Sequence, residues 1–146
     1  MPTKIRLQRF GKKGQPFYHV VVADSRAPRD GKFIEKIGVY NPKTIPATID
    51  LNLDRALYWI GTGAQPTDTT RAILSYKGVL YKHHLQGGVA KGALTQEQAD
   101  AKYNAWMEQK NIKVLQHTQK VQTSKSDDMK NRLAEESKKR EAIAKA

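Results

Sequence analysis

The residues with the clearest chemical potential are cations that recur through the first third of the chain. They lie at Lys4, Arg6, Arg9, Lys12, Lys13, Arg26, Arg29 and Lys32. Each cation that neutralises a phosphate releases condensed counterions, so about six such contacts would dominate the affinity for a nucleic acid. Structured RNA presents phosphates and 2′-hydroxyls in a shallow minor groove, which suits Arg and Lys on loops. We therefore expect an RNA-binding surface; the alternative is a solvated basic surface that only keeps the chain soluble.

Residue types that support catalysis or metal binding are sparse. His83 and His84 are adjacent, and adjacent side chains of a regular helix or strand point apart, whereas metal-binding pairs on a helix usually recur four residues apart. The carboxylates before residue 83 are scattered, and the sequence contains neither a P-loop nor a G-x-S-x-G motif. We expect no enzyme, no metal, no cofactor and no small-molecule substrate. A metal-dependent nuclease that assembles carboxylates from distant strands remains an alternative.

Two glycine-rich segments, 61–63 and 87–88, could expose backbone N–H groups to phosphate. A helix stop followed by a turn also explains Gly61 and Gly63. The nearby Asp68 would repel a phosphate, so we favour the structural role.

The net charge predicts a polyanionic partner. The 146 residues include 26 Lys/Arg and 14 Asp/Glu, a formal charge of +12, and residues 1–43 contain ten basic and three acidic side chains. Such a charge disfavours self-association, so we expect no homo-oligomer. Cysteine is absent, which excludes disulfides. No apolar run reaches the roughly 18 residues that span a bilayer, and no basic helix carries a large apolar face, so we expect a cytoplasmic protein without membrane contact.

Hydrophobic patterning predicts four strands and two helices in the first part of the chain. In residues 3–10, Ile5 and Leu7 share one face while charged side chains share the other, which is typical of a half-buried strand. A Gly/Pro turn and a β-branched run follow, which indicates a hairpin. We expect strands at 3–10, 17–23, 33–40 and 49–51, a helix at 53–62, and a second helix capped by Thr67 that ends near Gly78.

The composition changes after Tyr81, where apolar density falls. The runs Gln86-Gly87-Gly88 and Lys91-Gly92 are typical of a linker. We therefore predict a basic RNA-binding domain over residues 1–82, and a linker with a helical extension over residues 83–146.

The extension is expected to contain two helices. Thr95 and Gln98 form a capping box for a helix that carries Tyr103 and Trp106 on one face, which we expect to dock on RNA or on a neighbouring protein. A further helix is expected from Ser126, with i,i+4 ion pairs that contribute about 0.2–0.5 kcal/mol each.

Most aromatic residues are expected in the core, because they lie next to apolar positions. These residues are Phe10, Phe17, Phe33, Tyr40, Tyr58 and Trp59. Tyr18 is the exception, since it follows the lysine-rich turn and is a candidate for stacking on a base. A single-strand binder would need several exposed rings on one sheet face, which this pattern does not clearly indicate.

Residues 5–42, IRLQRFGKKGQPFYHVVVADSRAPRDGKFIEKIGVYNP, resemble the bacterial small-subunit ribosomal protein S16 family. The opening I-R-L, P-F-Y before a valine run, V-A-D-S-R, G-K-F-I-E-K-I-G and the closing Y-N-P occur in the family's order and spacing. The resemblance continues through Pro66-Thr67-Asp68 and the second helix, so it covers residues 1 to about 82.

The resemblance implies an α+β domain with a small, mainly antiparallel sheet and helices against one face. It also implies binding to the 5′ and central domains of small-subunit ribosomal RNA, beside neighbouring small-subunit ribosomal proteins, in support of subunit assembly and translation. The cations named above match the family's RNA-facing strand and loop positions, and Arg71 and Lys77 on the second helix are weaker candidates. Thr70 departs from the family's usual apolar residue, and family members commonly end soon after the second helix. A free-standing regulatory RNA or DNA binder remains an alternative.

Overall fold

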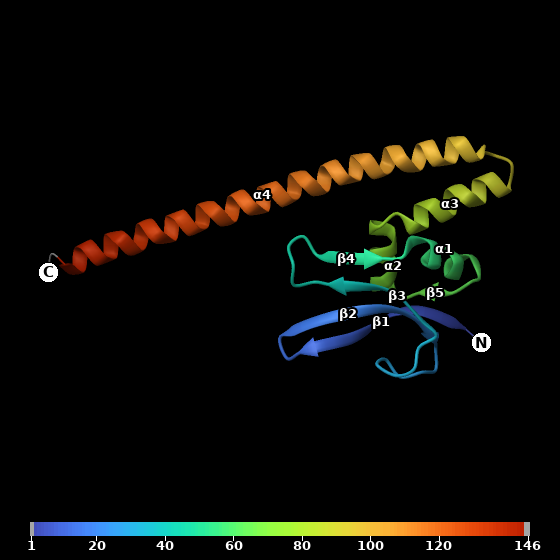
Figure 1. Cartoon of the computed structure of the whole chain (residues 1–146), viewed down its shortest axis with the longest axis horizontal. Coiled ribbons are helices and arrows are strands. Elements are labelled where there is room, and N and C mark those ends of the chain that lie inside the picture. The colour runs from blue at the N-terminus through green and yellow to red at the C-terminus, as the bar shows by residue number, and fades with distance from the viewer. Residues whose placement is uncertain (1, 145–146) are drawn as a thin grey trace. The chain divides into compact units, whose positions relative to one another are not determined.

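The computed structural model describes residues 2–144, which adopt the predicted α+β class (Figure 1). The strands are β1 (Thr3–Lys12), β2 (Gln15–Asp24), β3 (Glu35–Asn41), β4 (Thr48–Leu51) and β5 (Gln65–Pro66). The helices are α1 (Leu53–Gly61), α2 (Asp68–Tyr76), α3 (Val79–Ala90) and α4 (Gln96–Ala144). The four predicted strands and the two predicted helices are confirmed as β1 to β4, α1 and α2.

The sheet has the strand order β4-β3-β2-β1-β5. Strands β1 to β4 pair antiparallel, and β1 and β2 form one hairpin that is in register along both strands. Strand β5 is additional to the prediction and pairs parallel with Lys4 and Ile5 of β1. Strand β5 has only two residues, which is too short for an alternating pattern, and its proline lacks the N–H donor that a strand normally uses. The sequence therefore contains no signal for β5.

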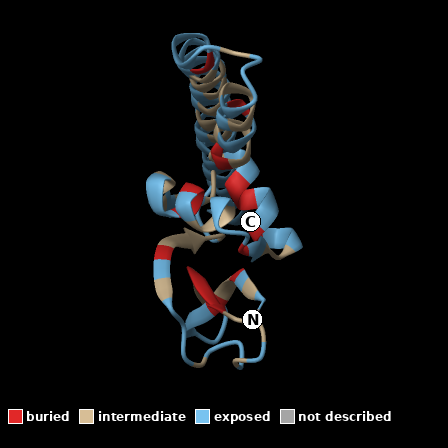
Figure 2. Ribbon diagram, turned by 90° about the vertical axis from the view of Figure 1, so that its right-hand side faces the viewer, coloured by how far each residue is buried: buried red, intermediate tan, exposed pale blue. Residues whose placement is uncertain are grey.

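The core lies between the sheet and the helices. Ile5 and Val22 of the strands and Leu74 and Val79 of the helices are fully buried and belong to one cluster. In Figure 2 the buried residues lie on the strands and on the helices above them, while the loops below are mostly exposed. Side chains alternate along β1, so Ile5 faces the helices and Arg6 faces away. We call the face covered by the helices the inner face of the sheet and the opposite face the outer face.

Glu35 links β3 to α1. Its carboxylate accepts hydrogen bonds from Arg55 Nε at 2.7 Å and from Trp59 Nε1 at 2.8 Å. The Asn52 side chain caps the same helix by accepting the Arg55 backbone N–H at 3.1 Å. The Arg55 hydrogen bond, followed by that of Trp59, lowers the pKa of Glu35 to about 2.

Thr70, the departure from the family pattern, has a polar partner inside the fold. It is fully buried, and its hydroxyl oxygen lies 2.9 Å from that of Thr67. Thr67 does occupy the N-cap position of α2, as predicted, but its side chain makes no capping bond to the backbone. The hydroxyl pair satisfies a buried polar group that would otherwise destabilise the helix.

The run Gln86-Gly87-Gly88, predicted as a linker, is helical, so that prediction is wrong, whereas the predicted Lys91-Gly92 does lie between α3 and α4. Helix α3 continues through residues 86–88. Glycine weakens a helix by about 0.5–1 kcal/mol relative to alanine, and tertiary packing outweighs this preference. Leu85 is buried, and a Cβ built on Gly88 would lie 3.3 Å from the Leu94 side chain, so the helix packs closely on both sides of the glycines.

The extension forms one long helix. Helix α4 passes without a break through Ser126, so the separate helix predicted to begin there is wrong. The Ser126 hydroxyl instead donates to the Thr123 carbonyl at 2.9 Å, a bond that a serine makes inside a helix. The predicted capping box is confirmed, because Thr95 and Gln98 exchange side-chain to backbone hydrogen bonds at 3.4 Å.

The chain divides into two compact units, residues 1–109 and residues 110–146. Helix α3 continues through residues 82 and 83. The functional division at that point, with RNA binding confined to residues 1–82, stays a prediction.

Tyr103 and Trp106 lie against the fold of their own chain, not on a free surface. The Trp106 ring lies 5.6 Å from the Tyr81 ring, and Lys82 Nζ lies 5.6 Å from the centre of the Tyr103 ring. Gly78 provides the space for this contact, since a Cβ there would lie 2.5 Å from the Trp106 ring. The two rings hold the start of α4 on α3, and their docking on RNA or on a neighbouring protein stays a prediction.

Replacing Gly78 with alanine is expected to destabilise the fold. Gly78 has a φ of +82°, and this left-handed backbone alone costs an L-residue about 1–2 kcal/mol, before the clash with Trp106 is added. We expect the free energy of unfolding in urea to fall by about 2 kcal/mol or more. Gly87→Ala is the matched control, because a Cβ there meets nothing within 4 Å. Similar small effects at both glycines would contradict the packing of Trp106 on Gly78.

The link between Glu35 and Arg55 is expected to weaken in acid. The pKa of Glu35 is lowered from 4.5 to about 2, so the carboxylate stabilises the fold fully above about pH 4.5 and loses this effect as the pH falls towards 2. Unfolding measured at several pH values should show wild type more stable than Glu35→Gln at neutral pH, with the difference shrinking below pH 4.5. A difference that stays constant down to pH 2 would contradict the ionised link.

Candidate nucleic-acid interface

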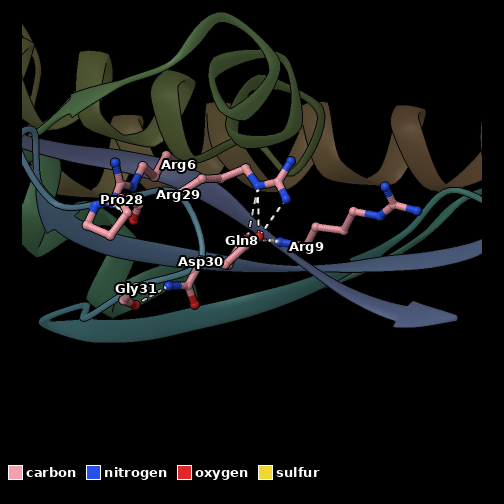
Figure 3. A network of polar contacts seen from close by, with 7 residues as sticks. All are labelled: Arg6, Gln8, Arg9, Pro28, Arg29, Asp30 and Gly31. Carbon is pink, nitrogen blue, oxygen red and sulfur yellow. Dashed lines mark hydrogen bonds and ion pairs between the residues drawn. The ribbon is translucent and has the colours of Figure 1, made fainter. Parts of the chain in front are cut away.

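The loop between β2 and β3, residues 25–34, lies across the outer face of β1 (Figure 3). Arg6 Nη2 donates to the Pro28 carbonyl at 2.7 Å, and Gln8 Nε2 donates to the Gly31 carbonyl at 2.6 Å. Both donors come from alternate positions of one strand, so they point the same way and meet the loop together. We call residues 25–34 the docked loop.

Asp30 adds a third connection between the docked loop and β1. Its Oδ1 accepts the backbone N–H of Arg9 at 3.0 Å, and the carboxylate also accepts hydrogen bonds from Arg29. The Arg29 side chain, followed by the Arg9 N–H, lowers the pKa of Asp30 below its usual range. The carboxylate therefore stays ionised at neutral pH and fixes the loop, while it pairs with the charge of Arg29.

Five of the predicted cations extend from this framework into solvent. They lie on the outer face of β1, in its turn and in the docked loop, and no hydrogen bond or ion pair of their side chains is observed within residues 2–144; they are Lys4, Lys12, Lys13, Arg26 and Lys32. The strand alternation places Lys4 and Lys12 on the outer face with the docked loop. The exposed cations thus come from two loops and one strand of the same framework.

Arg6 plays a different part from the one expected. The sequence indicated a solvent-facing cation, but Arg6 is half-buried beneath the docked loop, and its Nε is buried without a hydrogen-bond partner. Gln8 is 1 % exposed, and its Oε1 is likewise unpartnered. Both side chains fix the loop that carries the exposed cations, and partners 22 and 23 residues away leave no local signal in the sequence.

Arg9, Arg71 and Lys77 lie away from the outer face. Arg9 is opposite Tyr18 in the hairpin and shares the alternation of Ile5, and its guanidinium points away from the polar network in Figure 3. Arg71 belongs to α2, and Lys77 follows that helix directly. These three cations are not gathered with the docked loop.

The expectation that the aromatic residues are core is only partly correct. Tyr40 and Trp59 pack against the core, as predicted, whereas Phe10, Phe33 and Tyr58 are 38 %, 41 % and 53 % exposed. Phe10 lies on the outer face of β1, Phe33 in the docked loop and Tyr58 on α1, so each ring is exposed for its own reason.

Tyr18, the suggested stacking residue, is half-buried with its ring 6.1 Å from that of Tyr40. Neither His19 nor Lys36 was among the residues predicted to bind RNA. The strand register places both on the outer face, with His19 opposite Gln8 and Lys36 opposite Val21.

Comparison with known proteins identifies the family. A family model described as ribosomal protein S16 matches residues 9–67. A small ribosomal subunit protein bS16 of Flavobacterium johnsoniae is 71% identical over 114 residues, which cover 78% of this chain and 61% of the relative. The bS16 protein of Porphyromonas gingivalis is 58% identical over 146 residues, which cover 100% of this chain and 76% of the relative. The chain belongs to the ribosomal protein S16 family.

This membership confirms the family that the motifs in residues 5–42 indicated. It also confirms the prediction of a structural ribosomal protein rather than an enzyme. The alignment with the Porphyromonas gingivalis relative runs over all 146 residues and so includes the extension. The chain spans about three fifths to three quarters of the length of these S16 relatives.

Membrane-spanning helices and clusters of metal ligands are two further features that would indicate other functions. Within residues 2–144, no helix combines the length and the apolar character needed to cross a membrane. In the same range, no group of three or more potential metal ligands lies close together. His83 and His84 are exposed neighbours on α3.

Removing the Gln8 hydrogen bond is expected to loosen the docked loop. Gln8→Met retains the volume of the side chain but leaves the Gly31 carbonyl without its donor, so amide hydrogen exchange at Arg9 and Gly31 should accelerate while that of Val22 stays slow. The control is Gln15→Met, the same change at an exposed position of the hairpin. Unchanged exchange in the docked loop of the Gln8 variant would show that other contacts hold it.

Proposed function

We propose that this chain is a structural constituent of the small ribosomal subunit and that the outer face of its sheet binds small-subunit ribosomal RNA. The observation that carries the proposal is the docked loop. Three hydrogen-bonded connections to β1, from Arg6, Gln8 and the Arg9 backbone, fix the segment that carries Arg26 and Lys32.

The mechanism is electrostatic and geometric. Cations on a folded surface neutralise RNA backbones that approach one another, and so lower the repulsion between RNA helices that must pack together. Because the loop is ordered by the protein's own hydrogen bonds, less conformational entropy is lost on binding. The protein binds the packed RNA and not the open RNA, so by mass action it favours assembly.

The direct RNA contacts are assigned to the exposed cations of the outer face. These are Lys4, Lys12, Lys13, Arg26 and Lys32. Arg6 acts as a positioning residue for the docked loop, and the charge of Arg29 is partly offset by Asp30. Arg9, Arg71 and Lys77 would contact a different RNA segment, because they lie away from this face. The 5′ and central domains of the ribosomal RNA and the neighbouring small-subunit proteins are the partners we propose.

Removing two cations of the docked loop is expected to reduce the salt dependence of RNA binding. Each phosphate contact contributes about −0.7 to −0.9 to the slope of log K against log salt, so Arg26→Gln with Lys32→Gln should make the slope shallower by about 1.4–1.8. Filter binding of the full chain to small-subunit ribosomal RNA across a salt titration measures this slope.

The control is Lys130→Gln with Lys138→Gln, which removes the same charge from the exposed part of α4. An equal reduction in both double variants would mean that the net charge, and not the outer face, determines the affinity. Equal binding of wild type to an unrelated structured RNA of the same length would overturn the assignment to ribosomal RNA.

A further inference from the structure

Three rings gather on the outer face near the end of the β1–β2 hairpin. The ring centre of Phe10 lies 4.1 Å from that of His19 and 5.8 Å from that of Phe17, and Phe17 and His19 are 5.6 Å apart. Phe10 is opposite Phe17 in the register, and His19 is opposite the outward-facing Gln8, which places all three rings on one face. We call these three residues the aromatic platform.

The aromatic platform remains open to solvent. Phe10 is 38 % exposed, and Phe17 and His19 are half-buried. The docked loop bonds to Arg6, Gln8 and the Arg9 backbone, further from the hairpin turn. A single exposed ring is ordinary on a protein surface, but three rings in mutual contact form an apolar patch of the kind that binds a flat ligand.

The surroundings of the aromatic platform are cationic. Lys12 and Lys13 lie in the adjoining turn, and Lys36 is close enough to His19 to affect its titration. Burial, followed by the charge of Lys36, lowers the pKa of His19, so the imidazole is neutral at pH 7 and stacks as an uncharged ring. Aromatic rings beside cations are the arrangement with which proteins bind single-stranded nucleic acids, since the rings stack on bases and the cations meet phosphates.

Phe17 also borders a shallow depression of about 440 Å³. Asn41 and Lys43 line the same depression. An amide and an ammonium group at this place can form hydrogen bonds with the edge of a base, whereas a purely apolar patch would offer none.

We propose that the aromatic platform binds one unpaired RNA base by stacking on Phe10, with Lys12 and Lys13 on the flanking phosphates. This inference rests on the proposed function, because it adds a single-stranded subsite to a surface that otherwise contacts RNA backbones. Sites of this kind read unpaired bases in loops and bulges, which a duplex does not offer.

The test uses a single-stranded RNA decamer that contains 2-aminopurine, whose fluorescence is quenched when it stacks on an aromatic ring. Full-length wild type is expected to quench the probe. Phe10→Leu keeps an apolar side chain opposite Phe17 but removes the stacking surface, so quenching should be lost and the affinity for the decamer should fall about fivefold or more.

Tyr58→Leu is the matched control, since Tyr58 is an exposed ring on α1, away from the outer face. Melting curves of both variants show whether the fold is retained, and His19→Leu provides a second variant if Phe10→Leu unfolds. Quenching retained in Phe10→Leu and His19→Leu, or lost equally in Tyr58→Leu, would overturn the aromatic platform as a base-binding site. Binding of wild type to small-subunit ribosomal RNA is measured in parallel. If wild type does not bind this RNA, the proposed function is rejected instead of the aromatic platform.

Discussion

The candidate interface depends on the docking of a polar loop onto the uncovered face of a small sheet. Helices bury the inner face around Ile5, so the outer face of the same strand must find other partners for its polar side chains. Arg6 and Gln8 find them in the Pro28 and Gly31 carbonyls. A buried side chain that makes no hydrogen bond would destabilise the fold, so the bonds donated by Arg6 Nη2 and Gln8 Nε2 stabilise β1 and also order the loop. Stability and a preformed cationic surface therefore have one physical origin.

The sequence predicted the elements whose signals are local. Alternation around Ile5 defined the first strand, and the Thr95 and Gln98 pair defined the start of α4. The errors came where tertiary contacts outweigh local preference. Glycines at 87 and 88 suggested a linker, but both lie in α3, where Gly88 packs next to Leu94. Ser126 suggested a helix start, but a serine also fits inside a helix by bonding to a carbonyl one turn earlier.

The cations of the candidate site were identified from the sequence because charge and loop position are visible there. Their separate roles were not visible. Arg6 and Lys32 look equivalent in the sequence, yet one is half-buried under the docked loop and the other is exposed. Phe10 was expected in the core, but it lies with Arg6 and Gln8 on the outer face of the sheet, which the helices do not cover. These distinctions depend on contacts between segments about 20 residues apart, which no local pattern records.

The central claim is that the outer face, and not the net charge, contacts ribosomal RNA. Its most direct test is acetylation footprinting of lysines in the full chain, free and bound to small-subunit ribosomal RNA, read by mass spectrometry. We predict that bound RNA protects the lysines of the outer face, the hairpin turn and the docked loop, which are Lys4, Lys12, Lys13 and Lys32. The reactivity of Lys130, in the exposed part of α4, should be unchanged. Unchanged reactivity of these four lysines, with protection elsewhere on the chain, would contradict it.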